Sequence, residues 1–301
     1  MNRFSLIGVG ITSRCNGKCK FCCRTEGLRF DDGIIDMDLS ILDSLLLRTD
    51  YMVLNGNFGD PVLHPELISF LYKWKKIKSL TVEIATNGGV KPDSFWSELG
   101  KIGYKTVFGI DGLEDTHHRY RHTDYNKVIH NMKTYIDNGG DAVWQMIIFD
   151  YNYHQIDDAC KLAKKLGCKE FSAIRSNTYD NEFKRPYNML SRNEIMKKFK
   201  YEKVYCYWKE RNSFFINMYG DVHPCCHIGP YFNSNRYDDI RPIYLKNKKH
   251  ISLYTNDIDD ILNSPYIQYV YNNCDKIWRC KNTCGIKKIM PIIKKIKYEK
   301  F

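Results

Sequence analysis

The sequence predicts an α/β protein in which a partial (β/α)6 barrel precedes a small C-terminal module. Three observations support this prediction. Apolar β-branched runs alternate with amphipathic segments through residues 1–181, the pattern turns polar and aperiodic over 182–205, and half of the 12 cysteines fall in the last hundred residues. We therefore expect a barrel over 1–181, a connector over 182–205, a cysteine-rich module over 206–285 and a basic C-terminal helix or tail over 286–301.

Six of the apolar runs have the length and the β-branched composition of buried parallel strands. The segments between them have helical length; two of these begin near a proline and two others end at a glycine. Such β/α units can curl into a barrel whose chemistry collects on the loops after the carboxyl ends of the strands. The expected strands are Phe4–Ile11, Tyr51–Leu54, Leu80–Ala85, Thr106–Ile110, Val143–Phe149 and Phe171–Ile174. The expected helices are Leu39–Leu47, Pro65–Lys75, Pro92–Lys101, Tyr125–Asn138 and Gln155–Leu166, with another near Arg192–Phe199 in the connector.

The composition narrows the class of protein. Apolar residues make up 43% of the 301 residues and only 9 are prolines, which excludes a disordered or collagen-like chain. No window holds the roughly 18 to 20 consecutive apolar residues of a membrane span. Twelve cysteines in a chain of this length favour metal or redox chemistry over disulfides, so we expect a cytoplasmic protein. The net charge of +11 suits an anionic partner such as a nucleic acid, although the lysines between Lys287 and Lys300 have the spacing of a solvated helical face.

Three cysteines follow the first expected strand at spacings of four and three residues, namely Cys15, Cys19 and Cys22. Three thiolates on one short loop can bind three irons of a four-iron cube and leave the fourth iron open. A structural zinc site instead consumes four ligands and would here need Cys23 as the fourth. Because adjacent residues rarely reach one metal ion together, the spacing favours a [4Fe-4S] cluster with an open iron over a zinc knuckle.

This loop resembles the CxxxCxΦC loop of the radical S-adenosylmethionine superfamily, with Phe21 as the aromatic Φ residue. The resemblance extends over nearly the whole chain. It implies that the open iron binds the amino and carboxylate groups of S-adenosylmethionine. It also implies that an electron from the cluster cleaves the sulfonium to give methionine and a 5′-deoxyadenosyl radical, which removes a hydrogen atom from the substrate.

Other segments resemble the ligand-binding motifs of that superfamily. Residues 56–61, Gly-Asn-Phe-Gly-Asp-Pro, are similar to its GGEP segment, with aspartate in place of glutamate and Phe58 in place of a glycine. Thr86-Asn87-Gly88 is similar to its TNG segment, and 109–112 to its SIDG segment, with Gly109 in place of serine. The stretch 117–122, rich in histidine and arginine, suits either a substrate contact or a helix entry. The resemblance implies that S-adenosylmethionine is bound by Phe21, Gly59, Asp60, Pro61, Asn87, Asp111, Gln145 and Arg175.

The last hundred residues resemble the auxiliary-cluster module called SPASM, because Cys206 is followed by Gly220 and Cys225 at the module's spacing. Two of the module's cysteines are missing, and Tyr271 occupies the position of one of them. A single auxiliary [4Fe-4S] cluster, as in the shortened twitch arrangement, is therefore implied. Its implied ligands are Cys206, Cys225, Cys280 and Cys284, with Cys274 competing for either late position. A zinc site remains the alternative, since paired thiols also suit tetrahedral coordination.

Three further cysteines are not assigned to a cluster. Cys160 and Cys168 are expected to be small core residues. Cys226 stands beside Cys225, where the matching cysteine of radical peptide epimerases donates a hydrogen atom to a substrate radical. The alternative for Cys226 is an ordinary packed thiol.

The resemblance implies an enzyme that modifies a peptide or protein side chain, of maturase or epimerase type. A radical enzyme acting on a nucleotide, an RNA or a small molecule is the competing interpretation, and a non-catalytic iron-sulfur electron carrier is a third. A reducing partner such as flavodoxin or ferredoxin is implied. Because the first strand is expected to begin at Phe4, we expect a peptide to be recognised by the barrel mouth, the second module or a separate protein rather than by an N-terminal leader-binding domain.

Overall fold

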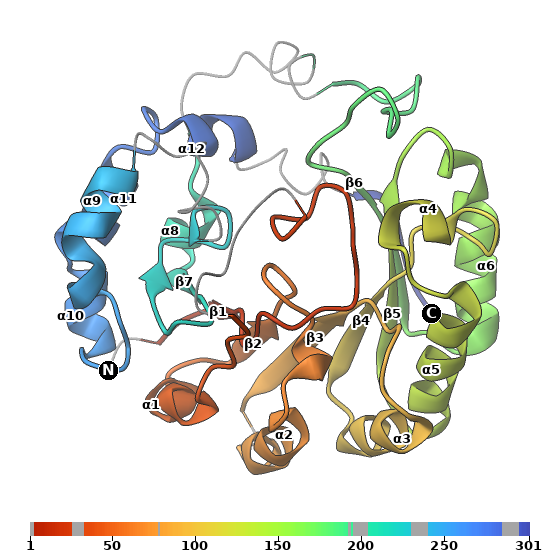
Figure 1. Ribbon diagram of the computed structural model, residues 1–301, viewed down its shortest axis with the longest axis horizontal. Coiled ribbons are helices and arrows are strands. Elements are labelled where there is room, and N and C mark those ends of the chain that lie inside the picture. The colour runs from red at the N-terminus through yellow and green to blue at the C-terminus, as the bar shows by residue number, and fades with distance from the viewer. Residues whose placement is uncertain are drawn as a thin grey trace. The chain divides into compact units, whose positions relative to one another are not determined.

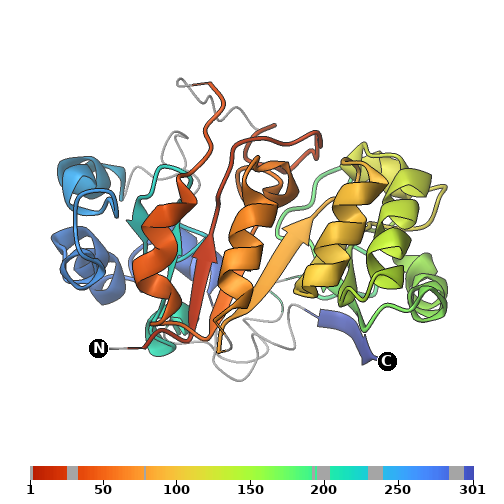
Figure 2. The ribbon, with the colours of Figure 1, turned by 90° about the horizontal axis from the view of Figure 1, so that it is seen from below.

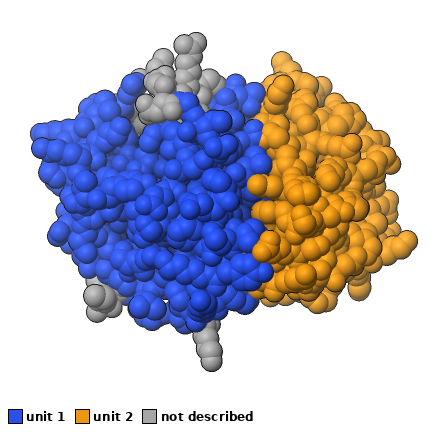
Figure 3. All heavy atoms as spheres, turned by 60° about the horizontal axis from the view of Figure 1, so that its bottom comes forward, with its two compact units in different colours: residues 1–15, 22–84, 204–284 blue, residues 16–21, 85–203, 285–301 orange. Residues whose placement is uncertain are grey.

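The computed structural model describes residues 3–25, 33–77, 79–191, 194, 204–229, 240–284 and 295–301. The chain forms two compact units, coloured separately in Figure 3. Unit 1 comprises residues 1–15, 22–84 and 204–284, and unit 2 comprises 16–21, 85–203 and 285–301. The C-terminal module, residues 204–284, belongs to the same unit as the first β/α repeats.

Unit 1 is built on a sheet with strand order β8-β7-β1-β2-β3. Strands β7, β1, β2 and β3 run parallel, whereas β8 is antiparallel to β7. Strand β1 is central, since its residues Leu6–Val9 pair with β2 on one edge and with β7 on the other. The strands are β1 (Leu6–Val9), β2 (Tyr51–Leu54), β3 (Thr81–Thr86, whose last two residues belong to unit 2), β7 (Ser213–Ile216) and β8 (Val222–His223).

Helices α1 and α2 lie on the same side of β1 and β2, as the two ribbon views show (Figures 1 and 2). Helix α2 buries Leu67, Leu71 and Trp74, which recur at the three-to-four-residue spacing of one helix face. The C-terminal part of unit 1 adds short helices, of which α11 contacts α9 and α10. The helices of unit 1 are η1 (Leu39–Leu42), α1 (Asp43–Leu46), η2 (Pro61–Leu63), α2 (Leu67–Lys75), α8 (Tyr207–Glu210), α9 (Arg241–Asn247), η6 (Lys248–His250), α10 (Ile258–Leu262), α11 (Pro265–Asn272) and α12 (Trp278–Thr283).

Unit 2 contains the sheet order β4-β5-β6-β9, in which β9 runs antiparallel to β6. Helices α3 and α5 pack against each other, and α6 buries Ile156, Ala159 and Ala163. The strands are β4 (Lys105–Gly109), β5 (Ala142–Ile148), β6 (Glu170–Arg175) and β9 (Lys295–Lys300). The helices are α3 (Asp93–Ile102), α4 (His117–Arg121), α5 (Tyr125–Asp137), η3 (Tyr153–Gln155) and α6 (Ile156–Leu166).

The predicted α/β class is confirmed, and the six expected strands coincide with β1 to β6 to within a few residues at their ends. The five barrel helices also form, the first of them as η1 followed by α1. The expected terminal helix is wrong for residues 295–300, which form β9. Residues 286–294 and almost all of the expected connector helix lie outside the described residues.

Candidate functional site

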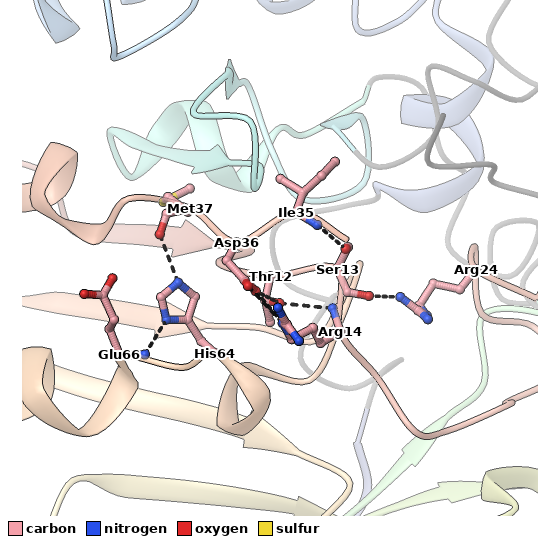
Figure 4. Close-up of polar contacts among 9 residues, drawn as sticks. All are labelled: Thr12, Ser13, Arg14, Arg24, Ile35, Asp36, Met37, His64 and Glu66. Atoms are coloured by element: carbon pink, nitrogen blue, oxygen red, sulfur yellow. Dashed lines mark hydrogen bonds and ion pairs between the residues drawn. The ribbon is translucent and has the colours of Figure 1, made fainter. Parts of the chain in front are cut away.

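The loop that leads to Cys15 is held in place by a second segment of unit 1. The Ser13 N–H donates to the Ile35 carbonyl at 2.8 Å, and the Met37 N–H donates to the Ile11 carbonyl at 2.9 Å. The Asp36 carboxylate accepts from the Thr12 hydroxyl at 2.6 Å and from Arg14 Nε at 2.9 Å (Figure 4). Residues 35–37 therefore fix the backbone between β1 and the first cysteine.

The loop after β2 packs directly on this backbone. A Cβ atom on Gly59 would lie 2.4 Å from the Thr12 carbonyl oxygen and 2.6 Å from that of Arg14, so only glycine fits. The Asp60 N–H donates to the Arg14 carbonyl at 2.7 Å, while the Asp60 carboxylate caps η2 by accepting from Val62 N–H at 3.2 Å. Pro61 begins η2 and is buried. The predicted GGEP-like loop and the cysteine loop are thus in contact.

The two adjacent cysteines at the end of the loop differ in their surroundings. The Cys23 thiol donates to the Asn57 carbonyl at 2.8 Å and is buried. Hydrogen bonding from Cys23 lowers the pKa of Cys22, and the backbone and guanidinium of Arg24 act in the same direction. Because a thiolate is the form that binds metal, the lowered pKa of Cys22 is compatible with its predicted place in the cysteine loop.

Cys226 lies in the same apolar cluster of unit 1 as Cys22. This cluster joins Cys23, Phe58, Phe215 and Met218, with Cys22, Ile35, Trp208, Tyr219 and Cys226 packed at its margin. Asn57 Nδ2 also donates to the Cys226 carbonyl at 3.1 Å. The second module is therefore joined to the cysteine loop through the segment 56–58.

Unit 2 carries the middle of the cysteine loop. Asn87, after β3, donates through Nδ2 to Asn16 Oδ1 at 2.9 Å, and its own Oδ1 accepts from Gly89 N–H at 2.8 Å. Asn87 is buried, so this amide pair fixes the residue that follows Cys15. Sequence reasoning placed Asn87 at the site but missed Asn16, which no motif marks.

Phe21 packs into an aromatic cluster of unit 2. Its ring lies 5.8 Å from that of Phe183, 6.2 Å from that of Tyr120 and 6.4 Å from that of Phe149, measured between centroids. Cys19 contacts the same cluster. The Φ residue of the loop therefore anchors it in the apolar interior of unit 2.

Asp111 is completely buried, and its carboxylate is engaged by protein groups. Arg121 Nε donates to Asp111 Oδ2 at 2.5 Å, and the Ile147 N–H donates to Oδ1 at 2.6 Å. Burial disfavours the Arg121 cation, but the charges of Asp111 and Cys19 outweigh it and raise the pKa of Arg121 above its ordinary range. Asp111 thus holds a cation within electrostatic reach of Cys19.

Arg121 is a residue that the sequence analysis did not single out by itself. A Cβ on Gly109 would lie 2.6 Å from its guanidinium, which explains why glycine stands where the superfamily's motif has serine. Its neighbour His117 is buried between Asp111 N–H, which donates to Nδ1 at 3.2 Å, and the Thr123 hydroxyl, 2.8 Å from Nε2. The stretch 117–122 therefore folds as α4 and its cap, and its residue Arg121 binds the buried Asp111 carboxylate.

Two other residues expected to bind S-adenosylmethionine, Gln145 and Arg175, are only half-buried. Gln145 is half-buried on β5 and its backbone carbonyl accepts from Ile110 N–H at 2.9 Å. Arg175 ends β6, half-buried, and burial lowers its pKa. Both belong to unit 2, Gln145 at the middle of β5 and Arg175 at the carboxyl end of β6.

The five candidate auxiliary ligands all belong to unit 1, and Cys225, Cys280 and Cys284 are buried there. Burial raises the pKa of Cys225 well above its ordinary value, and the negative charges of Cys226, Cys284, Cys280 and Cys206 add to this rise. Cys274 acts instead on Cys206, and its thiol faces the Val204 carbonyl at 3.9 Å. Such a crowd of buried thiols is costly as free thiolates and suits a cationic metal centre.

The remaining cysteines are core residues, as expected. Cys160 and Cys168 are buried, and burial raises the pKa of each thiol. All twelve cysteines are free thiols. Over the described ranges, no three His, Cys, Asp or Glu side chains stand as the ligands of a metal ion, and no helix has the length and apolarity that a bilayer crossing needs.

Comparisons with protein families agree with this arrangement. The model of the radical SAM superfamily matches residues 9–163, just over half of the chain. A second model, SPASM, described as an iron-sulfur cluster-binding domain, matches residues 206–285.

Known proteins resemble the chain at low identity. GTP 3′,8-cyclase from Clostridium botulinum is 25% identical over 173 residues, 54% of either protein. The chain spans 30% to 54% of the length of the curated relatives it matches. SuiB of Streptococcus suis bound to its precursor peptide SuiA has a TM-score of 0.62 at 14% identity, covering 93% of this chain and 71% of SuiB. The anSMEcpe protein with bound AdoMet and the Cp18Cys peptide has a TM-score of 0.58 at 15% identity, covering 93% and 88%. At such identities these structures show a shared fold.

Proposed function

This chain belongs to the radical SAM superfamily, and from that premise we propose that it cleaves S-adenosylmethionine reductively and removes a hydrogen atom from a peptide or protein side chain. The chain is an enzyme with a SPASM domain, and its family implies a [4Fe-4S] cluster, S-adenosylmethionine and auxiliary iron-sulfur ligation. When bound, the cluster and S-adenosylmethionine supply the electron and the carbon radical that this chemistry needs.

One observation carries the proposal. The Gly59–Pro61 loop lies on the backbone of residues 12–14 at distances that admit only glycine, directly before Cys15. A loop of this kind supports both the metal ligands and a small ligand beside them, which a plain electron carrier does not need. This contact therefore favours the enzyme over the carrier.

The proposed ligands of the first cluster are Cys15, Cys19 and Cys22. Cys22 is suited to this role by its lowered pKa, and Cys19 by the neighbouring Arg121 cation. The ion pair with Asp111 keeps Arg121 positively charged. We therefore propose Arg121, alongside Arg175, as a partner for the carboxylate of S-adenosylmethionine. The Asn87–Asn16 hydrogen bond would fix the position of the cysteine loop, and Phe21 would anchor the loop in the apolar cluster.

For the auxiliary cluster we propose Cys206, Cys225, Cys280 and Cys284. Support comes from the pKa of Cys225, which is raised by the charges of Cys206, Cys280 and Cys284 but not chiefly by that of Cys274. Cys226 contacts the apolar cluster that also holds Cys22, and this supports its proposed role as a hydrogen donor.

A peptide substrate is supported by two solved structures of this fold that hold a peptide. A nucleotide substrate is the second candidate, favoured by the relative named GTP 3′,8-cyclase and by the net charge of +11. We further propose a cytoplasmic protein that takes electrons from a flavodoxin or ferredoxin, because twelve cysteines, none of them in a disulfide, are typical of a reducing compartment.

The first experiment tests the reaction class. Anaerobically reconstituted protein, reduced and given S-adenosylmethionine, is expected to release 5′-deoxyadenosine and to hold about eight irons per chain if two cubes form. A variant with Cys15, Cys19 and Cys22 all changed to alanine is expected to keep about four irons per chain and to release no 5′-deoxyadenosine. An intact protein with its full iron content that releases no 5′-deoxyadenosine would contradict the proposal and favour a carrier.

The second experiment tests the substrate class. Deuterium transfer into 5′-deoxyadenosine is measured with perdeuterated peptides encoded by small reading frames adjoining the gene, and in parallel with deuterated nucleoside triphosphates. Transfer from a peptide alone is the expected result. Transfer from a nucleotide alone would replace the peptide proposal with the second candidate.

A further inference from the structure

Arg24 ties the end of the cysteine loop back to its beginning. It is the second residue after Cys22, and its Nη1 donates to the carbonyl of Ser13, which stands two residues before Cys15 (Figure 4). The backbone between these two points carries all three expected ligands of the first cluster. Ser13, Cys15, Cys22 and Arg24 all belong to unit 1. The hydrogen bond therefore closes the loop at its base.

The same nitrogen atom also reaches the loop after β2. Arg24 Nη1 donates to the Phe58 carbonyl at 3.2 Å. A terminal guanidinium nitrogen carries two N–H groups, so Nη1 can serve the two carbonyls with separate hydrogens. Because a guanidinium is a cation, both hydrogen bonds are charge-assisted. Arg24 thus joins three stretches of backbone, namely its own, the one before Cys15 and the GGEP-like loop.

Phe58 stands where the superfamily's motif has a glycine, and its side chain supplies a second hold on the same residue. The ring is buried in the apolar cluster with Cys23, Phe215 and Met218, and its centroid lies 6.4 Å from that of Phe215. Burial of an aromatic ring in such a cluster fixes the backbone that carries it. Position 58 is therefore held both by the apolar cluster and by the cation that closes the cysteine loop.

Residues 59–61, which follow directly, are the ones expected to bind S-adenosylmethionine. Their contact with the backbone before Cys15 is tight, because a Cβ on Gly59 would lie 2.4 Å from the Thr12 carbonyl oxygen. The Asp60 N–H donates to the Arg14 carbonyl at 2.7 Å. A displacement of about 1 Å in a group that orients a reactant has large effects on an enzyme, even when its cause lies outside the reacting centre. A residue that holds this loop in place therefore acts on the bound ligand without touching it.

We propose that Arg24 is a positioning residue that holds the loop of residues 57–61 against the cysteine loop and thereby sets the affinity for S-adenosylmethionine. Arg24 acts through the carbonyls of Ser13 and Phe58 and makes no contact with the ligand. By closing the cysteine loop in the free protein, it lowers the conformational entropy that is lost when the ligand binds. The inference rests on the proposed function, because it takes S-adenosylmethionine to bind beside these two loops.

Arg24→Gln tests the proposal. Glutamine reaches only as far as the Nε position of arginine, so both Nη1 hydrogen bonds are lost. The dissociation constant for S-adenosylmethionine is measured by equilibrium dialysis, with anaerobically reconstituted protein whose cluster is kept oxidised so that no cleavage occurs. Per chain with a filled first cluster, this constant is expected to rise about tenfold, the scale of one lost hydrogen bond to a charged group. A dissociation constant equal to that of the wild type would overturn the proposal.

Lys18→Gln is the matched control for charge. Lys18 is an exposed cation of the same cysteine loop, and within the described part of the chain its side chain has no hydrogen bond or ion pair. The substitution removes the same charge as Arg24→Gln and is expected to leave the dissociation constant unchanged. A rise as large as that in Arg24→Gln would show that the charge of the loop governs the affinity, and would overturn the role of loop closure.

Two measurements on the apo proteins separate positioning from plain stabilisation. Hydrogen exchange is expected to be faster in residues 57–60 of Arg24→Gln and unchanged in Leu6–Val9 of β1. If Arg24 only stabilised the fold, urea unfolding would shift to lower concentration while the dissociation constant of the folded, loaded protein kept its wild-type value, and this result would overturn the positioning role. Failure of the proposed function has a different signature, since wild-type protein with a filled first cluster would then bind no S-adenosylmethionine.

Discussion

At the scale of single residues, the adjacent thiols Cys22 and Cys23 show how position separates two identical side chains. Cys23 is buried and contacts the Asn57 carbonyl, whereas the pKa of Cys22 is lowered by its contact with Cys23 and by Arg24. The spacing of the cysteines alone predicted which of them would serve as a ligand, but it contained no information on what Cys23 does.

The pair yields a direct prediction. Cys22→Ala is expected to abolish release of 5′-deoxyadenosine and the iron of the first cluster, because a cube held by two thiolates is poorly retained. Cys23→Ala, the matched neighbour, is expected to keep both. Iron content and 5′-deoxyadenosine yield are measured after identical reconstitution. Loss of the first cluster in Cys23→Ala would show that the assignment of the two thiols is reversed.

Gly59 gives a second prediction at this scale. Alanine there would press against two backbone oxygens, which cannot move aside as a side chain can, so we expect the free energy of unfolding to fall by about 1–3 kcal/mol. Gly10→Ala is the control, since its Cβ would meet the side chains of Phe58 and Phe215 at 3.3 and 3.4 Å and a backbone oxygen, that of Ile216, only at an ordinary 3.9 Å. Urea unfolding of both apo variants checks the difference. Equal stability of the two variants would count against a tight contact between the two loops.

Some residues of the site could not be predicted from the sequence. The cysteines and Asn87 belong to recognisable spacings and motifs, whereas Asn16 and Arg121 owe their place to partners brought close by folding. Arg121 had one available signal, the glycine at position 109, whose missing side chain leaves room for a guanidinium.

At the scale of elements, the strands β1 to β6 were predictable because each is an apolar run between helix-length segments. Strand β7 was missed because its four residues, all buried, stand in a module without β/α periodicity. Strand β9 was missed because lysines and isoleucines in the tail also fit a helical spacing. The alternation in Lys295-Ile296-Lys297-Tyr298-Glu299-Lys300 is the period of two that marks a strand.

The pairing of β9 leads to a third prediction. Lys297 forms ion pairs with Asp157 at 2.7 Å and with Glu299 at 3.1 Å, and β9 covers the edge of β6. Deletion of residues 295–301 exposes that edge, so we expect faster amide exchange in β6 and no change in β1. Hydrogen exchange with mass spectrometry measures both strands. Unchanged protection of β6 would mean that β9 does not pair with it in solution.

At the scale of the whole molecule, two buried histidines make stability depend on pH. Burial lowers the pKa of His117 to about 4 and that of His223 to about 3, from an ordinary value of 6.5. The unfolded chain therefore binds more protons than the folded chain below pH 6.5. The stabilisation is complete above pH 6.5 and is lost as the pH falls through the window from 6.5 to 4.

The direction of this pH dependence gives a fourth prediction. Each histidine is expected to lower the free energy of unfolding by up to about 1.4 kcal/mol for every pH unit below 6. Urea unfolding of the apo protein at pH 7, 6 and 5 measures the slope, and His117→Gln is expected to reduce it by the share of one histidine. A slope that His117→Gln leaves unchanged would mean that the pKa of this ring is the same in the folded and the unfolded chain, and would contradict the prediction.

The central position of β1 has a consequence for the folding of the chain during its synthesis. Residues 6–9 leave the ribosome long before residues 213–216, which supply one of their two neighbouring strands. Until synthesis nears its end, the edge of β1 that β7 will cover is open and is able to pair with another nascent chain. Metal loading of the loop after β1 is then best accomplished late, once the carboxyl-terminal part of the same unit has arrived and closed that edge.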